Sequence, residues 1–78
     1  MFDLSIYGKT LKDIRTQKGI SQQELAFMTE LDRTYISMLE RNLRQPSLET
    51  VFKISVALGF KASEFIALIE TTPPQLNS

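Results

Sequence analysis

The sequence contains neither cysteine nor histidine among its 78 residues. Without cysteine the chain can form no disulfide, no thiolate zinc site and no cysteine nucleophile, and without histidine it has no imidazole ligand or imidazole general base. The carboxylates that remain show no spacing beyond that of solvated helices, so they indicate no catalytic site. These absences exclude most enzyme templates, and we expect a protein that is not an enzyme and that uses no cofactor and no metal.

Long apolar runs are also missing. No segment approaches the roughly 20 apolar residues that are needed to cross a bilayer. Residues 1–9 place Asp3 and Lys9 around only a few apolar side chains, so this segment lacks the apolar core of a signal peptide. We therefore expect a cytoplasmic protein without a membrane partner.

Charge of one sign is not in excess, because nine Lys and Arg balance nine Asp and Glu. This balance counts against a protein that binds polyanions without specificity. Basic side chains are nevertheless concentrated in residues 9–44, which hold seven basic and five acidic residues and thus a net charge of +2. An excess of this size arises by chance in many domains, so it does not identify a partner.

The chain does contain enough apolar side chains for one small core, since 42% of its residues are hydrophobic. We expect a single domain over residues 1–78, with a core over about 7–70 and a frayed tail over 71–78. Apolar residues recur at helical spacing, whereas strand-like alternation does not persist. The expected fold class is all-α, with helices at residues 7–18, from 21 onward, at 33–41, from Ser47 to Gly59 and at 62–70.

Capping residues mark where these helices begin. Ser21 and Glu24 have the spacing of a capping box, Asp32 is expected to accept an amide hydrogen bond at the start of the third helix, and Ser47 caps the fourth. The third helix leaves one side free, with Arg33, Ser37 and Arg41 on it. The residues expected to face the core are Tyr7, Leu11, Ile14, Leu25, Ala26, Met28, Ile36, Leu39, Leu43, Leu48, Val51, Ile54, Ser55 and Leu58.

Two short helices joined by a tight turn, the second with an exposed polar face, are typical of a helix-turn-helix. Four segments carry a more specific signal: SQQELA at 21–26, LDRTYIS at 31–37, LERN at 39–42 and PSLET at 46–50. In this order they resemble the phage-repressor (Xre/Cro-type) family of DNA-binding domains, and residues 7–8 and 11–15 match its first helix. The similarity covers about residues 7–66. More narrowly, DRTYIS resembles the controller proteins of restriction-modification systems.

The resemblance implies a compact five-helix domain like that of lambda repressor, in which the second and third helices form the helix-turn-helix. It places Arg33, Thr34 and Ser37 against base edges, and an arginine can contact guanine O6 and N7 together. Gln22 matches a position that donates a hydrogen bond to a DNA phosphate. The residues expected at the DNA backbone or groove edge are Gln22, Tyr35, Arg41, Asn42 and Arg44.

Other matched positions concern the domain itself. Arg15 and Glu40 match a pair that in this family forms a salt bridge between the first and third helices. Glu30 departs from the family pattern, because Gly or Asn usually supplies a left-handed residue in that turn. Lys61 stands where a Ser or Thr normally caps the last helix, so Ser63 is an alternative cap that would move the helix start by two residues.

One recognition helix covers only a few base pairs, so such proteins usually bind DNA as two-fold dimers. Residues 65–69 are apolar on nearly all sides. We expect Phe65 and Ile66 partly in the core, Leu68 and Ile69 outside it, and Phe65, Leu68 and Ile69 at a dimer interface. The alternative is a hydrophobic helix that only packs on its own domain.

The expected function is that of a sequence-specific transcriptional regulator. Its expected partners are double-stranded operator DNA, a second copy of the chain and RNA polymerase, with no small-molecule ligand. The alternative is an antitoxin-like interaction module, or a phage-type repressor with a protein partner, that uses residues 65–69 to cap another protein.

Overall fold

Five helices make up residues 4–70, the part of the chain that the computed structural model describes. They are α1 (Leu4–Gln17), α2 (Gln22–Thr29), α3 (Arg33–Glu40), α4 (Leu48–Ala57) and α5 (Ala62–Ile69). The predicted all-α class is therefore confirmed, although α1 begins three residues before the predicted Tyr7. The predicted frayed tail, residues 71–78, lies outside the described residues.

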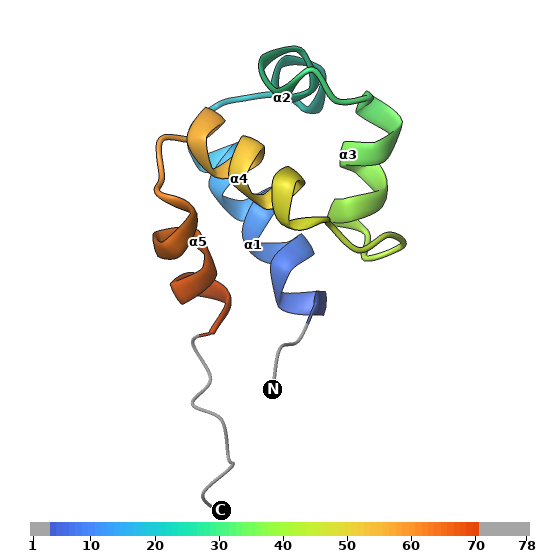
Figure 1. The fold of residues 1–78 in the computed structure, drawn as a ribbon. Helices are drawn as coiled ribbons and strands as arrows, with labels where there is room; N and C mark the ends of the chain where they lie inside the picture. The colour runs from blue at the N-terminus through green and yellow to red at the C-terminus, as the bar shows by residue number, and fades with distance from the viewer. Residues whose placement is uncertain (1–3, 71–78) are drawn as a thin grey trace, which may run out of the picture.

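α1 lies between α3 and α5 in the view of Figure 1 and contacts both helices. It packs against α3 on one side and α5 on the other, while α2 contacts both α3 and α4, and α4 contacts α5. In Figure 1, α3 and α5 lie on opposite sides of the view. None of the helices in residues 4–70 has the length and apolarity to cross a membrane.

The core follows the helical repeat of apolar residues. Tyr7, Leu11 and Ile14 are buried along α1 as predicted, and Phe65 of α5 packs its ring 5.4 Å from that of Tyr7. Phe60, from the turn before α5, meets the Phe65 ring edge-on at 6.2 Å. The further core residues are Leu25, Ala26, Ile36, Leu39, Val51, Ile54, Leu58 and Ile69.

Three predicted core positions are wrong, because Met28, Leu43 and Leu48 are 48%, 61% and 66% exposed. Leu43 follows the end of α3, so the helical spacing that would bring it under Leu39 no longer applies. Met28 lies beside the buried Thr29, which takes the inward position near the end of α2.

The prediction for Leu48 is wrong because Val51, Ile54 and Ser55 form the core face of α4. Leu48 lies in the first turn of α4, at the edge of this face and in line with Phe52 and Val56, at positions i, i+4 and i+8 of one helix. Phe52 and Val56 are 52% and 69% exposed. Leu48, Phe52 and Val56 therefore form an exposed apolar row, called the α4 outer stripe below.

Helix caps agree with the sequence at two sites. Ser21 and Glu24 form the predicted capping box, with 3.0 Å from Glu24 N to Ser21 Oγ and 2.8 Å from Ser21 N to Glu24 Oε1. Ser47 Oγ accepts a hydrogen bond from Thr50 N at 3.1 Å. α2 and α4 therefore begin where local sequence places them.

The caps of α3 and α5 differ from the prediction. Asp32 occupies the N-cap of α3 with an extended backbone, but its side chain accepts no cap hydrogen bond, so that part of the prediction is wrong. Lys61 precedes α5, and its N–H donates to Glu64 Oε1 at 2.8 Å. The alternative start at Ser63 is therefore wrong, because the Glu64 carboxylate satisfies the cap amide without a hydroxyl at position 61.

The turn between α2 and α3 keeps its left-handed residue although that residue is not glycine. Glu30 has φ 58° and ψ 30°, and the next amide, Leu31 N, donates to Ala26 O at 3.1 Å. This conformation costs a side-chain-bearing residue about 1 to 2 kcal/mol. The departure at Glu30 therefore leaves the helix-turn-helix geometry intact.

Candidate nucleic-acid interface

α3 presents a polar outer face. Arg33 and Thr34 are exposed and Ser37 is half-buried, whereas Ile36 and Leu39 on the other face are fully buried. Eight residues at about 1.5 Å per residue make a helix about 12 Å long, which matches the width of the major groove. α3 has the size and the polarity of a helix that enters this groove.

Close backbone packing anchors the C-terminal end of α3 on α1. A Cβ atom added at Gly8 of α1 would lie 2.6 Å from the carbonyl oxygen of Leu39 and 2.9 Å from that of Glu40. Both distances are shorter than van der Waals contact, so only glycine allows this approach. Gly8 thereby keeps the end of α3 against α1.

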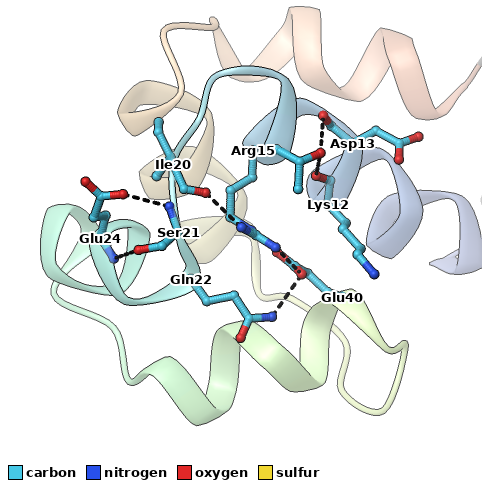
Figure 2. Close-up of polar contacts among 9 residues, drawn as sticks. Lys12, Asp13, Arg15, Ile20, Ser21, Gln22, Glu24 and Glu40 are labelled. Atoms are coloured by element: carbon cyan, nitrogen blue, oxygen red, sulfur yellow. Dashed lines mark hydrogen bonds and ion pairs between the residues drawn. The ribbon is translucent and has the colours of Figure 1, made fainter.

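A buried ion pair also ties α3 to α1. Arg15 Nε and Nη2 donate to Glu40 Oε2 and Oε1 at 2.6 Å and 3.0 Å, and the two side chains are only 9% and 3% exposed (Figure 2). The salt bridge that the resemblance implied is therefore confirmed. Breaking such a buried pair from one side costs about 3 to 5 kcal/mol, because the other charge stays buried without a partner.

Gln22 joins this pair from α2. Its Nε2 donates to Glu40 Oε1 at 3.0 Å, and Arg15 Nη1 donates to the carbonyl oxygen of Ile20 at 2.7 Å (Figure 2). Arg15, Gln22 and Glu40 are called the polar cluster below. The cluster connects the three helices that form the face around α3. The contact from Gln22 was not predicted from the sequence.

Tyr35 of α3 and Arg44, which follows α3, lie next to each other. The Tyr35 hydroxyl is 3.3 Å from Thr50 Oγ1, and the Arg44 guanidinium lies 5.5 Å from the centre of the Tyr35 ring. Arg41, Asn42 and Arg44 are exposed after the end of α3. Asn42 has φ 61°, a left-handed conformation that asparagine tolerates better than most residues.

The predicted dimer residues are placed differently. Phe65 and Ile69 are 0% and 3% exposed and belong to the core, whereas Leu68 is 39% exposed. The expectation that Ile69 lies outside the core is wrong, because Phe65 and Ile69 are four residues apart and share the inward face of α5. The larger exposed apolar surface is the α4 outer stripe, whose i, i+4, i+8 spacing was visible in the sequence.

Within residues 4–70, no group of three or more acidic side chains is arranged to hold a metal ion. The chemistry that the face around α3 offers is hydrogen-bond donation and positive charge, from Arg33, Arg41 and Arg44. Such groups bind phosphate oxygens and the base edges of the major groove.

This chain is similar to known proteins over most of its length. Residues 11–65 match the helix-turn-helix family. The control protein C.BamHI from Bacillus amyloliquefaciens is 42% identical over 62 residues, covering 78% of this chain and 76% of that protein. C.MunI from Mycoplasma sp is 42% identical over 72 residues, covering 90% of this chain and 97% of that protein.

A solved structure agrees with these relatives. The restriction-modification controller protein C.AhdI from Aeromonas hydrophila superposes with a TM-score of 0.77 at 41% identity, over 81% of this chain and 96% of that one. The five-helix fold and the resemblance proposed from residues 21–50 are thus confirmed. The chain belongs to the Xre/Cro-type helix-turn-helix family and is a DNA-binding transcription regulator, not an enzyme.

Proposed function

We propose that this regulator is the controller protein of a restriction-modification system and acts as a homodimer on a palindromic operator. The observation that carries the proposal is the outer face of α3, where Arg33, Thr34 and Ser37 share one side of the helix. Gly8 and Arg15 of α1 anchor its other side. The control proteins that cover most of this chain support the restriction-modification context.

In this proposal, Arg33, Thr34 and Ser37 read base edges in the major groove. Arg33 makes the bidentate contact to a guanine, which discriminates against the wrong base by about 1 to 3 kcal/mol. Gln22 donates to a phosphate, and Tyr35, Arg41, Asn42 and Arg44 approach the backbone or the groove edge. The phosphate contacts orient the helix, whereas the base contacts select the sequence.

The dimer interface combines Leu68 with the α4 outer stripe. These residues lie on two helices that pack against each other, and all four expose large apolar side chains. The Glu49–Lys53 ion pair, at 3.6 Å, lies on the same helix as the stripe and offers a polar rim. Burial of this surface against a second copy would place two α3 helices in successive major grooves, about 34 Å apart.

Dimerisation and DNA binding are both mass-action steps, so the concentration of the protein governs operator occupancy. Occupancy then blocks or recruits RNA polymerase at the neighbouring promoter. The equal numbers of basic and acidic residues favour binding through base contacts and few phosphate contacts, with a moderate dependence on salt.

The test is fluorescence anisotropy with a labelled duplex from the DNA upstream of the gene, titrated at physiological salt in the presence of random competitor. We expect competitor-resistant binding that Arg33→Ala weakens by about 1 to 3 kcal/mol. Lys61→Ala is the matched control, because it removes one exposed charge directly before α5, the helix that lies on the opposite side of the view from α3 in Figure 1. Equally weak binding of both duplexes by the wild type, together with a stoichiometric co-purifying protein, would replace this proposal with the interaction module.

A further inference from the structure

We propose that Glu40 is a positioning residue for DNA binding: it holds the Gln22 carboxamide so that one N–H stays directed to a DNA phosphate. The proposal rests on the phosphate contact at Gln22 in the proposed function. In this proposal Glu40 itself touches no DNA. The supporting observation is the geometry of the polar cluster in Figure 2.

Glu40 fixes the orientation of the Gln22 amide. Glu40 Oε1 already accepts from Arg15 Nη2, and an ionised carboxylate can only accept hydrogen bonds. Gln22 must therefore turn its NH₂ group, not its oxygen, toward Glu40, and the 3.0 Å contact has this polarity. An NH₂ group has two protons, so one N–H bonds Glu40 and the other remains for a second acceptor.

A carboxylate near the DNA backbone would repel phosphates, but Arg15 binds both oxygens of Glu40 and compensates its charge. A neutral donor such as Gln22 can then share Glu40 Oε1 without adding a second buried cation. The pair therefore acts as a fixed acceptor that orients Gln22 without repelling the phosphate that Gln22 would bind.

Arg15 also donates to the carbonyl oxygen of Ile20, the residue before the Ser21 cap of α2. One guanidinium thus binds the chain entering α2 and the last residue of α3. With Glu40 only 3% exposed, this arrangement exists before DNA arrives, so Gln22 loses less side-chain freedom on binding than a free glutamine would.

The experiment uses operator duplexes that carry a single methylphosphonate, one position at a time, so that each phosphate loses its charge in turn. For the wild-type protein we expect one phosphate in each half-site whose modification weakens binding about threefold to tenfold through the loss of one hydrogen bond. Gln22→Met should abolish the sensitivity at this phosphate alone. Gln23→Met, which changes the exposed neighbouring glutamine, is the control and should preserve it.

The decisive variant is Glu40→Gln, measured at a temperature where circular dichroism shows it folded. We expect the sensitivity at the Gln22 phosphate to fall below about twofold, while the other phosphates keep theirs. An equal loss at every phosphate, or unchanged sensitivity at the Gln22 phosphate, overturns the proposal, because a merely structural role for Glu40 predicts one of these results. If the wild type binds its operator but no phosphate depends on Gln22, this inference fails and the proposed function stands.

A second measurement needs no variant and no DNA. Side-chain ¹⁵N relaxation of the free protein should show a restricted Gln22 NH₂ group and a flexible Gln23 NH₂ group, with an order parameter below about 0.6 for the latter. Equal mobility of the two groups overturns the proposal even if Glu40→Gln does not fold.

Discussion

α3 and α4 pack against the same core but differ in what they leave exposed. Each buries an apolar face, Ile36 and Leu39 in α3 and Val51 and Ile54 in α4. The outer face of α3 carries Arg33, while the outer face of α4 carries the α4 outer stripe.

This difference suits the two faces to the two partners of the proposed function. A polar face with flexible cations suits a hydrated, negatively charged groove, whereas an apolar row gains from contact with another apolar surface. The inward residues alone would not distinguish the two helices, because both show the same helical repeat. The outward residues therefore carry the functional information, and the predictions below test each face in turn.

The largest effect should come from the α4 outer stripe. Phe52→Glu places a charge in the proposed dimer interface, so we expect a monomer by sedimentation velocity. Operator affinity should fall by about 100-fold or more, because two linked half-sites bind far more tightly than separate ones. Phe27→Glu is the matched control, since Phe27 of α2 is 84% exposed and should leave the dimer unchanged. A dimeric Phe52→Glu would place the interface elsewhere.

Arg33→Lys should have the next largest effect. Lysine keeps the positive charge but lacks the planar pair of donors that contacts guanine O6 and N7 together. We expect a loss of about 1 to 3 kcal/mol per half-site on the operator and no change on random duplex, with the same salt slope. The corresponding Arg41→Lys should leave operator binding nearly unchanged. Equal loss on both duplexes would mean that Arg33 contacts only the backbone.

Arg41→Ala should have a smaller and less selective effect. If Arg41 contacts a phosphate, its removal weakens operator and random duplex alike, and the slope of log K against log salt falls by about 1 per protomer. Anisotropy titrations at several salt concentrations measure this slope. A loss confined to the operator would instead assign Arg41 a role in reading bases.

The sequence predicted those features that depend on local spacing. The Ser21–Glu24 capping box and the buried repeat of Tyr7, Leu11 and Ile14 follow from residues three or four positions apart, and the structure confirms both. The Arg15–Glu40 pair spans 25 positions, and only the family resemblance suggested it.

The predictions from sequence failed for features that depend on how the helices pack against one another. Leu48 and Ile69 are apolar residues whose burial depends on the rotation of α4 and α5 against the core, which hydrophobic spacing does not determine for a helix of eight to ten residues. The Gln22–Glu40 hydrogen bond joins residues 18 positions apart on different helices, so no local sequence pattern predicts it. The candidate site residues on α3 could be proposed from the sequence because they lie within the motifs that resemble the family.

The smallest effect at neutral pH should come from Tyr7, which lies in the core and belongs to neither face. Its hydroxyl is buried and has no hydrogen-bond partner within residues 4–70, so Tyr7→Phe should leave the free energy of unfolding unchanged or raise it by about 1 kcal/mol at pH 7. Dimerisation and operator affinity should not change.

High pH should separate wild type from Tyr7→Phe. Burial raises the pKa of the Tyr7 phenol above its ordinary value of 10.0, and the nearby Tyr35 raises it further. Above pH 10 the unfolded state therefore loses the Tyr7 proton while the folded state keeps it. The wild-type free energy of unfolding should fall by up to about 1.4 kcal/mol per pH unit from this group. Urea unfolding at pH 7, 10 and 11 measures the difference between the two proteins, and parallel curves would show that the phenol ionises equally in both states. A difference between the two proteins that grows with pH would show that the folded state keeps the Tyr7 proton. Intact dimerisation and operator binding of Tyr7→Phe at pH 7 would show that neither face depends on this buried hydroxyl.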